Sequence, residues 1–422
     1  MNETSPIHQA WILSSGSELT AGRSLDTNGP WLARQLAELG IETPCLLAVS
    51  DDGADLERAL RHAAEHTELI IMTGGLGPTE DDLTRDVLAR LAGVPLELDA
   101  ACLETMRAFF AERNWPMPNA NRVQAMLPRG ATALPNRRGT APGIFIEIGR
   151  TACYALPGVP HEMEEMFRGE VAPRVRERAG GQAVLHRCLR TFGRPEADLG
   201  EQLRDLMRRG ANPSVGVTAA GAMISVSLTA TAPSRVSAEA LAEATAREVR
   251  ARLGDTVFGE GDDTLASTVG KLLVARGQTL CTAESCTGGL VGKLLTDTPG
   301  SSRYYLGGVV TYANEAKERL LGVPESLLRE HGAVSRPVAE HMARAARETF
   351  GSDYALSITG VAGPDGGTAE KPVGLVYFGL AGPGGVDVRE LRLGPTAPRE
   401  LIRLRSARGL LNLLRRELLR GG

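Results

Sequence analysis

The feature that most constrains the fold is a regular alternation of apolar strands and amphipathic helices joined by short loops. It runs along residues 1–172 and resumes after residue 263. Such alternation is typical of a parallel sheet covered by helices, because a crossover between parallel strands usually contains a helix. In the first stretch, strands are predicted at residues 10–19, 41–50 and 68–75, and helices at residues 27–40 and 51–67.

The pattern changes between residues 173 and 258, where a strand, a helix, a two-strand meander and a long helix are predicted. The segment GEGDD (259–263) is rich in glycine and acidic residues, and we interpret it as a linker. The sequence therefore predicts two three-layer α/β domains with mostly parallel sheets, at residues 1–172 and 259–422. A small α+β domain at residues 173–258 joins them.

Composition and charge argue against several classes of function. The formal net charge of −4 gives no overall basic field for nucleic acid or anionic lipid. The six cysteines contain no C-x-x-C pair, so neither a zinc site nor a disulfide framework is indicated. The opening MNETSPIHQ lacks the pattern of a signal peptide, and no apolar run approaches the ~18 residues of a membrane span. We expect a cytoplasmic protein with no membrane partner, and nucleic-acid binding is not favoured.

The segment CTAESCTGG (281–289) is the first candidate for chemistry. A predicted strand ends here and a helix follows, so Ser285 lies where free backbone N–H groups gather and can hold an oxyanion or a phosphate. The alternative is that Ser285 only caps the helix. Cys286 is the rival nucleophile, but a neighbour of a residue that faces the site is expected to pack behind it.

Lys317 offers a base for Ser285. Only four of the 47 basic residues are lysines, and Lys317 falls in the first turn of a predicted helix, with Asn314 as the expected N-cap. A cation is disfavoured at that end of the helix dipole, so the neutral amine is favoured, and a neutral lysine can take the proton of a serine. Tyr312, at the end of the preceding strand, could relay that proton or orient the amine.

Four motifs in this region carry a family resemblance. TAESCTGG, VVTYANEAKERLLGV, HGAVSRPVAEHMA, and SITGVAGPDGG followed by KPVGLVY resemble the CinA C-terminal domain, the nicotinamide mononucleotide deamidase (PncC) family, over about residues 265–415. The resemblance implies hydrolysis of nicotinamide mononucleotide to nicotinate mononucleotide and ammonia without a cofactor. Ser285 would attack the carboxamide carbon, and N–H groups of the 285–289 turn would hold the oxyanion.

The same resemblance suggests where the substrate is bound. The 5′-phosphate needs an anchor, for which the GVAGPDGG backbone and Arg403 are candidates, although Arg403 could equally lie on a solvated helix face. Lys371 could lie at the rim of the pocket or merely lead into a strand. The residues expected to bind the oxyanion or the substrate are Cys286, Thr287, Gly288, Gly289, Thr359, Gly360, Gly363 and Arg403.

A second glycine loop, TGGLGPTEDDLT (73–84), follows the predicted strand at 68–75. A helix after such a loop suits a phosphate, yet Asp81 and Asp82 would repel one unless a divalent cation bridges them. The alternative is structural: acids in the first turn of a helix complement its dipole, and Thr79 with Asp82 has nearly the spacing of a capping box.

This loop also belongs to a set of motifs with a family resemblance. GSELTAGRSLDTN, VSDD, TGGLGPTEDDLT, NRRGTAPG and LPGVPHEM resemble the CinA N-terminal domain, which is related to the MoaB and MogA molybdopterin-binding fold. The resemblance implies hydrolysis of ADP-ribose to AMP and ribose 5-phosphate with a divalent metal (Co, Mn or Mg) and potassium. It assigns the metal to Asp26, Asp81 and Asp82, and the pyrophosphate to Gly74, Gly75, Gly77, Thr79 and Thr140.

The middle region resembles the KH-type linking domain of full-length CinA proteins, but residues 173–257 contain no GXXG loop with basic flanks. A spacer or dimerisation role is therefore expected, and the resemblance implies a homodimer. Two readings of the whole chain stay open. One is a bifunctional enzyme that recycles pyridine nucleotides, and the other is a nucleotide-binding regulator linked to competence or DNA damage that does not turn its ligand over.

Overall fold

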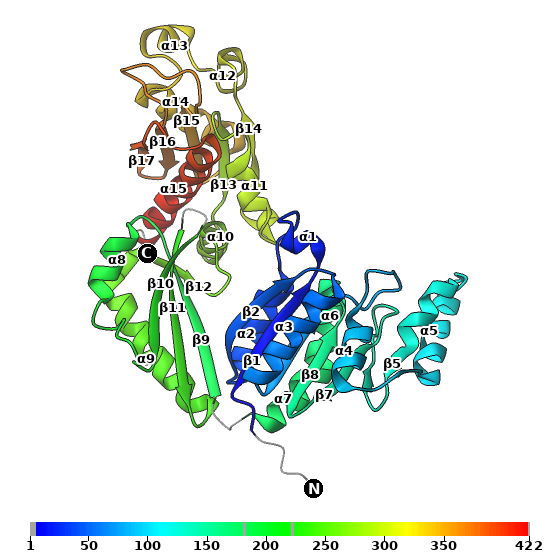
Figure 1. Ribbon diagram of the computed structural model, residues 1–422. Coiled ribbons are helices and arrows are strands. Elements are labelled where there is room, and N and C mark those ends of the chain that lie inside the picture. The colour runs from blue at the N-terminus through cyan, green and yellow to red at the C-terminus, as the bar shows by residue number, and fades with distance from the viewer. Residues whose placement is uncertain (1–5, 180–182, 221–222, 421–422) are drawn as a thin grey trace. The chain divides into compact units, whose positions relative to one another are not determined.

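The computed structural model describes residues 6–179, 183–220 and 223–420. The chain divides into two compact units, each described here by itself. The first unit contains Met1–His186 and Thr229–Ala242, and the second contains Arg187–Leu228 and Glu243–Gly422. Figure 1 labels the elements.

A six-stranded sheet forms the centre of the first unit, with strand order β2-β1-β3-β8-β7-β6. The first four strands in that order are parallel, and β7 and β6 are antiparallel to their neighbours. The strands are β1 (Gln9–Ser15), β2 (Glu42–Val49), β3 (Leu69–Thr73), β6 (Thr132–Leu134), β7 (Gly143–Ile148) and β8 (Thr151–Leu156), and a separate antiparallel pair joins β4 (Leu96–Leu98) to β5 (Met126–Pro128).

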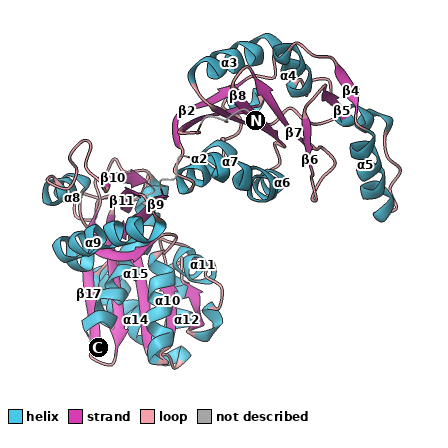
Figure 2. Ribbon diagram, turned by 90° about the horizontal axis from the view of Figure 1, so that it is seen from below, coloured by secondary structure: helices cyan, strands magenta, loops and turns pink. Residues whose placement is uncertain are grey.

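Helices cover both faces of this sheet, as the sequence predicts. Figure 2 shows α3 and α4 on one face and α2, α6 and α7 on the other. Each face encloses its own apolar cluster: Leu56 and Leu60 of α3 belong to one, and Leu32 and Leu36 of α2 to the other. The helices are α1 (Ser17–Thr20), α2 (Asn28–Glu38), α3 (Gly53–His66), α4 (Thr84–Ala92), α5 (Ala100–Glu112), η1 (Asn119–Ala125), α6 (Pro160–Met166), η2 (Phe167–Val171) and α7 (Ala172–Arg178).

A small four-stranded sheet of order β10-β11-β9-β12 follows. Its elements are β9 (Ala183–Thr191), α8 (Glu196–Leu203), β10 (Ser214–Ala220), β11 (Met223–Ala232), α9 (Arg235–Leu253), η3 (Gly254–Thr256) and β12 (Val257–Glu260). The predicted linker at 259–263 is partly wrong, because Gly259 and Glu260 belong to β12 and pair antiparallel with β9. Glycine and acidic residues indicated a loop, but pairing with β9 extends the strand through them.

A five-stranded sheet of order β14-β13-β15-β16-β17 forms the centre of the C-terminal domain. Strand β13 is parallel to both β14 and β15, and the last two strands are antiparallel to their neighbours. The strands are β13 (Leu280–Glu284), β14 (Tyr305–Val310), β15 (Tyr354–Gly360), β16 (Leu375–Gly382) and β17 (Gly385–Arg392). All five residues of β13 are buried, as expected for a central strand with helices on both faces.

Two apolar clusters enclose this sheet. Val269 of α10, Val291 of α11 and Leu410 of α15 belong to one cluster, and Leu321 of α12 and Met342 of α14 belong to the other. The domain is therefore three-layered. The helices are α10 (Leu265–Arg276), α11 (Leu290–Thr296), η4 (Ser301–Arg303), α12 (Asn314–Leu321), α13 (Glu325–His331), α14 (Arg336–Phe350) and α15 (Arg399–Arg420).

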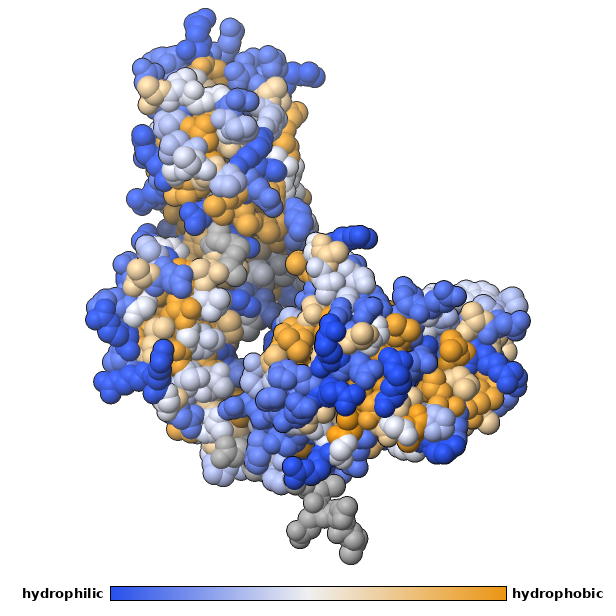
Figure 3. Space-filling view, viewed as in Figure 1, coloured by the Kyte–Doolittle hydropathy of each residue, from blue (hydrophilic) through white to orange (hydrophobic). Residues whose placement is uncertain are grey.

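The surface mixes polar and apolar side chains. On the face that Figure 3 shows, polar residues are interspersed with smaller groups of apolar ones. Within the described residues, none of the helices is both long enough and apolar enough to cross a membrane.

Candidate functional site

In the C-terminal domain, the carboxyl ends of three neighbouring strands meet at one edge of the sheet. Ser285 follows β13, Thr311 follows β14, and Thr359 lies at the end of β15. The Ser285 N–H donates to the Ile358 carbonyl at 3.0 Å, and the Thr311 N–H donates to the Glu284 carbonyl at 2.7 Å. The edge of an α/β sheet where strands end is where such folds place their ligands.

Lys317 extends from α12 to this edge and meets Ser285. Its Nζ lies 3.2 Å from Ser285 Oγ, 2.8 Å from the Thr311 carbonyl oxygen and 3.4 Å from the Tyr312 carbonyl oxygen. The lysine is 1% exposed and Ser285 is 8% exposed, so both reacting groups are largely shielded from water. The structure thus brings together the two residues that the sequence predicts as nucleophile and base.

The surroundings of the Lys317 amine favour its neutral form. Burial lowers its pKa, because the charged form loses its hydration. Among the residues that the structure describes, no carboxylate forms an ion pair with this amine. A neutral amine has two N–H donors and one lone pair. The two carbonyl oxygens can accept the donors, which leaves the lone pair for the Ser285 hydroxyl.

The 285–289 turn requires its two glycines and does not use Ser285 as a cap. Gly288 and Gly289 have φ values of 58° and 89°, in the left-handed region that favours glycine. The N-cap of α11 is Gly289 and no side chain caps the helix, so the capping alternative for Ser285 is wrong. Asn314 is likewise the first residue of α12, and Ala313 is its N-cap.

Not all amides of the turn are available to an oxyanion. The Ser285 amide is used by the Ile358 carbonyl, and the Gly288 amide donates to the Ser285 carbonyl at 2.9 Å. In the part of the chain described, the amides of Cys286, Thr287 and Gly289 make no hydrogen bond to another backbone group. The Cys286 and Thr287 amides also interact with the Cys286 sulfur, which leaves the Gly289 amide, among the described residues, for a ligand.

Cys286 lies behind the turn. Its side chain is 6% exposed and belongs to the apolar cluster beneath α11 and α15. Burial raises the pKa of this thiol to about 12, so almost none of it is thiolate at neutral pH. The thiol therefore has neither the exposure nor the ionisation that a nucleophile needs.

Glu284 supports the site, and the sequence analysis did not single it out. It is 2% exposed, and its carboxylate accepts the Val291 and Gly292 amides at 3.0 and 2.8 Å. These two amides belong to the first turn of α11 and would otherwise lack a partner. The carboxylate thus fixes the start of α11 against the end of β13, with the Ser285 turn between them.

Among the described residues, the Lys317 amine bonds to the carbonyl oxygen of Tyr312 and not to its hydroxyl. Tyr312 is 59% exposed, and its hydroxyl accepts a hydrogen bond from Arg399 Nη2 at 2.8 Å. Arg399 also donates to the carbonyl of Gly363 at 2.5 Å, so it bridges β14 to the GVAGPDGG loop. Sequence reasoning missed Arg399, which lies 87 residues from Tyr312.

The other predicted residues of this site are placed as follows. Arg403 donates to the Thr287 carbonyl at 2.6 Å and so holds the turn. Thr287 is fully buried and its hydroxyl has no hydrogen-bond partner among the described residues, while the buried Thr359 hydroxyl donates to the Ala333 carbonyl at 2.9 Å. Gly360 ends β15, and the Lys371 amine donates to the His331 carbonyl at 2.5 Å.

A cavity of about 430 Å³ lies at the corresponding edge of the first sheet. Its wall includes the ends of β1, β2, β3 and β8, which are parallel neighbours. The residues that line it are Ser15, Gly16, Glu18, Asp51, Gly74, Gly75, Leu76, Gly77, Thr79, Asp81, Asp82, Gln124, Thr140, Ala141, Pro157, Gly158, Val159 and Glu162. All the residues predicted for the pyrophosphate thus lie around one cavity.

The glycine loop of this cavity is held from behind. Gly74 and Gly75 have φ values of 103° and 66°, and the Thr84 hydroxyl and amide donate to their carbonyls at 3.0 and 3.2 Å. Arg85 is 2% exposed and donates to the carbonyls of Leu76 and Gly77 at 2.8 and 2.9 Å. The sequence analysis missed this buried guanidinium.

The helix after the loop begins later than predicted. It starts at Thr84 with Leu83 as N-cap, so Asp81 and Asp82 precede it and the first-turn and capping-box alternatives are wrong. Instead, the Asp82 carboxylate accepts the Thr79 amide and hydroxyl at 2.9 and 2.5 Å. The two acids belong to the wall of the cavity.

The cavity is strongly acidic. Within the part of the chain that the structure describes, no lysine, arginine or histidine lines it, whereas five carboxylates do: Glu18, Asp51, Asp81, Asp82 and Glu162. Asp51, Glu18 and Glu162 lie in the VSDD, GSELTAGRSLDTN and LPGVPHEM motifs, but none of the three was predicted as a site residue. Asp26, expected as a metal ligand, does not line the cavity. Its carboxylate accepts the Ser14 hydroxyl and the Gly29 amide at 2.7 and 2.9 Å.

Carboxylates suit a hard divalent cation, but these five do not form a preassembled cage. Within the described residues, the one group of three metal-ligating side chains whose ligand atoms lie within 4.8 Å of one another is His62, Glu65 and His66, outside the cavity. Magnesium and manganese are commonly held by one or two carboxylates with water and substrate phosphates completing the shell. The carboxylates of the cavity fit that mode of binding.

Comparison with known proteins covers the whole chain. Residues 11–177 match the family described as "Probable molybdopterin binding domain", residues 186–259 the "Damage-inducible protein CinA KH domain", and residues 262–418 the "CinA C-terminal domain". A Symbiobacterium thermophilum protein described as competence-damage inducible is 46% identical over 420 residues, covering 97% of this chain and 99% of that protein. A CinA-like protein of Gloeobacter violaceus is 45% identical over 412 residues, covering 97% and 96%.

The crystal structure of a competence/damage inducible protein from Agrobacterium tumefaciens is also similar. It is 42% identical, covers 37% of this chain and 93% of that one, and has a TM-score of 0.36.

Proposed function

The chain belongs to the CinA family, and on that premise we propose that its C-terminal domain is a serine amidohydrolase acting on nicotinamide mononucleotide in the cytoplasm. The observation that carries the proposal is the buried Lys317 amine, 3.2 Å from Ser285 Oγ and without an acidic partner among the described residues. A lysine whose pKa is lowered by burial can act as a base, and a serine hydroxyl needs a base to become a nucleophile.

The proposed reaction begins at the carboxamide of the substrate. Ser285 Oγ attacks the carboxamide carbon, and its proton passes to the lone pair of Lys317. The carbonyl oxygen becomes an oxyanion, for which the Gly289 amide is a donor, and the Cys286 and Thr287 amides would have to exchange the Cys286 sulfur for it. The cationic pyridinium ring of the substrate withdraws electrons from this carbon and so favours the attack.

The second half of the reaction uses the same two residues. The tetrahedral intermediate collapses, the C–N bond breaks, and ammonia leaves with the proton that Lys317 had taken. A nicotinoyl ester on Ser285 remains. Lys317, neutral again, takes a proton from water, whose oxygen attacks the ester. The C–O bond to Ser285 then breaks, Lys317 returns the proton to Ser285 Oγ, and nicotinate mononucleotide leaves. Every step uses groups of this chain and water.

We further propose that Arg399 anchors the 5′-phosphate. Arg403 was the candidate from the sequence, but it is only partly exposed and its guanidinium holds the Thr287 carbonyl of the turn. Arg399 is exposed and lies between Tyr312 and the GVAGPDGG loop, at the same edge of the sheet as Ser285. An exposed guanidinium beside glycine amides suits a phosphate.

Ammonia release from nicotinamide mononucleotide tests this function. Wild type is expected to be active with chelator present, and Ser285→Ala is expected to be inactive. Arg399→Ala should raise KM more than it lowers kcat, and Arg405→Ala, an exposed arginine on the same helix, is the matched control. Absence of turnover in the wild type would refute the proposal and favour a ligand-binding regulator.

For the first unit we propose metal-dependent hydrolysis of ADP-ribose to AMP and ribose 5-phosphate. The supporting observation is that five carboxylates and no basic residue line the cavity. A pyrophosphate is anionic, so it can enter such a cavity only with cations. Asp51, Asp81 and Asp82 would hold a divalent metal together with the substrate. The metal, assisted by potassium, would supply charge neutralisation and activation of water.

The residues of the cavity have their own part in this proposal. Amides of the glycine loop would bind phosphate oxygens, and Arg85 holds the loop carbonyls behind it. The test is AMP release from ADP-ribose with magnesium, manganese or cobalt. Asp81→Asn combined with Asp82→Asn should abolish AMP release and leave ammonia release intact, whereas Glu80→Gln, an exposed neighbour outside the cavity wall, should have little effect. Ligand binding without turnover would refute the catalytic proposal for this cavity alone.

A further inference from the structure

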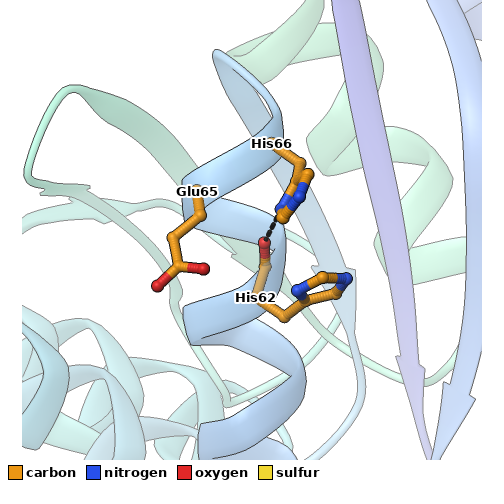
Figure 4. A group of neighbouring side chains, drawn as sticks. All are labelled: His62, Glu65 and His66. Atoms are coloured by element: carbon orange, nitrogen blue, oxygen red, sulfur yellow. Dashed lines mark hydrogen bonds between the residues drawn. The ribbon is translucent and has the colours of Figure 1, made fainter.

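We propose that the last turn of α3 binds one borderline divalent transition-metal ion, such as zinc, through His62, Glu65 and His66. The three side chains come from positions i, i+3 and i+4 of the helix, and their ligand atoms all lie within 4.8 Å of one another. All three are exposed, so an ion can reach them from solvent. Figure 4 shows them along one stretch of the helix.

The histidine tautomers fit metal binding. His66 Nδ1 lies 2.8 Å from the carbonyl oxygen of His62, drawn as a dashed line in Figure 4. In the tautomer that donates this hydrogen bond, the proton sits on Nδ1 and the lone pair of Nε2 is free. Metal-binding histidines commonly donate their second ring nitrogen to a backbone carbonyl, which orients the ring and raises its basicity.

Trp11 of β1 holds both imidazole rings. Its ring centroid lies 5.4 Å from that of His62 with the planes at 74°, and 5.7 Å from that of His66 with the planes at 26°. The two imidazole centroids are 4.3 Å apart. This packing keeps the two imidazole rings next to each other, so side-chain rotations are sufficient to bring their nitrogens to one ion.

The surrounding charges favour a cation. Helix α3 ends at His66, so the site lies where the partial negative charge of the helix carbonyls gathers. The nearest arginines along the helix are occupied elsewhere: Arg61 pairs with Glu57, and Arg58 pairs with Asp55. The carboxylate of Glu65 adds a formal negative charge.

The ligand set selects the class of metal. Two imidazole nitrogens and one carboxylate suit zinc, nickel or copper, whereas magnesium and calcium prefer oxygen ligands only. Zinc would need the ligand atoms about 2.0–2.2 Å from the ion. Exposed side chains can reach that geometry by rotamer changes, with water in the fourth position.

This site is chemically distinct from the acidic cavity of the same unit. Asp51 of the cavity precedes the N-terminus of α3, and the histidines lie at its C-terminus. A helix of 14 residues is about 21 Å long, so the two sites lie roughly 20 Å apart. A metal titration of this protein would therefore report two sites, one selective for nitrogen-binding ions and one for oxygen-binding ions.

Zinc binding by the full-length, chelator-treated chain tests the proposal. Isothermal titration of the Asp81→Asn, Asp82→Asn protein, which removes two acids of the cavity, should show one zinc ion per chain with micromolar affinity. His62→Asn and His66→Asn should each weaken binding at least about tenfold. Glu65→Gln should weaken it by a smaller factor, and His8→Asn, an exposed histidine outside the group, should leave it unchanged.

A second readout locates the ion. Nickel bound here should quench the fluorescence of Trp11, and Trp11→Phe should remove that quenching without abolishing zinc binding. Zinc affinity that is the same in wild type, His62→Asn and His66→Asn would overturn the proposal. Absence of stoichiometric binding in the wild type would overturn it as well. All three ligands are exposed, so these variants should fold normally.

Discussion

Replacement of Lys317 by arginine or methionine tests the chemistry of the C-terminal site most directly. Arginine keeps a positive charge and a long side chain but cannot lose its proton at accessible pH, and methionine keeps most of the volume but has no amine. If Lys317 acts as a base, both variants must lose activity to a similar extent. If Lys317 acts only as a fixed positive charge, the Lys317→Arg variant should retain much of the activity.

The expected magnitude follows from the contacts of the amine. A positioned general base contributes about 10²–10⁴-fold, which corresponds to roughly 2.7–5.4 kcal/mol of barrier. Two carbonyl oxygens, of Thr311 and Tyr312, lose their donor in Lys317→Met, at a cost of about 1–3 kcal/mol for a buried unpaired group. The Lys317→Met variant also no longer buries a polar amine, and this offsets part of that cost. We expect a folded protein with at least about a hundredfold lower kcat.

The assay is ammonia release from nicotinamide mononucleotide as a function of pH, with thermal unfolding measured in parallel. Wild-type kcat should rise with pH as the amine loses its proton, and burial should bring this rise below the ordinary pKa of lysine, about 10.4. The matched controls are Lys293→Arg and Lys293→Met, because Lys293 is 65% exposed and pairs with Asp297. Retention of more than about a tenth of wild-type activity in Lys317→Arg would refute the role of Lys317 as base.

Four further outcomes are expected. Cys286→Ala should keep most of the activity, and wild type should resist thiol alkylation at mildly alkaline pH, because burial raises the pKa of this thiol to about 12; rapid inactivation by alkylation would contradict this. Glu284→Gln should lower kcat at least about tenfold with little change in KM, because an amide can no longer accept both the Val291 and Gly292 N–H groups; unchanged steady-state kinetics would show that the carboxylate does not position the turn. Gly288 has a φ of 58°, so Gly288→Ala should lower the free energy of unfolding by about 1–2 kcal/mol and reduce activity. Gly300 has a φ of 81° and lies away from the site, so Gly300→Ala should lower stability by a similar amount without loss of activity. Equal losses of activity in both variants would point to a general effect on stability. Because burial lowers the folded-state pKa of Lys317, the unfolded chain binds more protons between that pKa and the ordinary value. The free energy of unfolding should therefore rise with pH across this window, and Lys317→Met should flatten the slope; an identical slope in the variant would contradict the lowered pKa.

Local patterns in the sequence were sufficient for the elements and for the central pair of the C-terminal site. Ser285 and Lys317 could be associated because each follows a strand, and parallel strands place their carboxyl ends at one edge. The residues at which helices begin were predicted less well. Ser285 resembles a cap, but its amide pairs with Ile358 across the sheet and the turn continues to Gly289. Nothing local to the sequence indicates a hydrogen bond between residues 73 positions apart.

Several residues that were not predicted from the sequence have partners that are distant in the chain, although Glu284 and Arg85 bond to groups within nine positions. Arg399 meets Tyr312 across 87 residues. Glu18 of α1 and Glu162 of α6 both line the acidic cavity, although 144 positions separate them in the chain. Such residues become visible only when the strand order is known. Asp26 shows the converse, because a motif placed it at the site whereas its carboxylate holds the start of α2.

The two glycine-rich turns show what a glycine loop does and does not determine. Both follow a strand with parallel neighbours, and both contain glycines with positive φ that expose backbone amides. Their chemistry nevertheless differs, because the neighbouring strands supply different side chains. Near Gly288 the site contains the Ser285 hydroxyl and the buried Lys317 amine. Near Gly74 it contains carboxylates and, among the described residues, no lysine, arginine or histidine. If this reasoning holds, loss of the Lys317 amine should abolish only the reaction at Ser285. Loss of the Asp81 and Asp82 carboxylates should abolish only the reaction in the acidic cavity. Both loops keep their glycines in these variants. A single substitution that silenced both reactions in a folded protein would show that the two sites do not act independently.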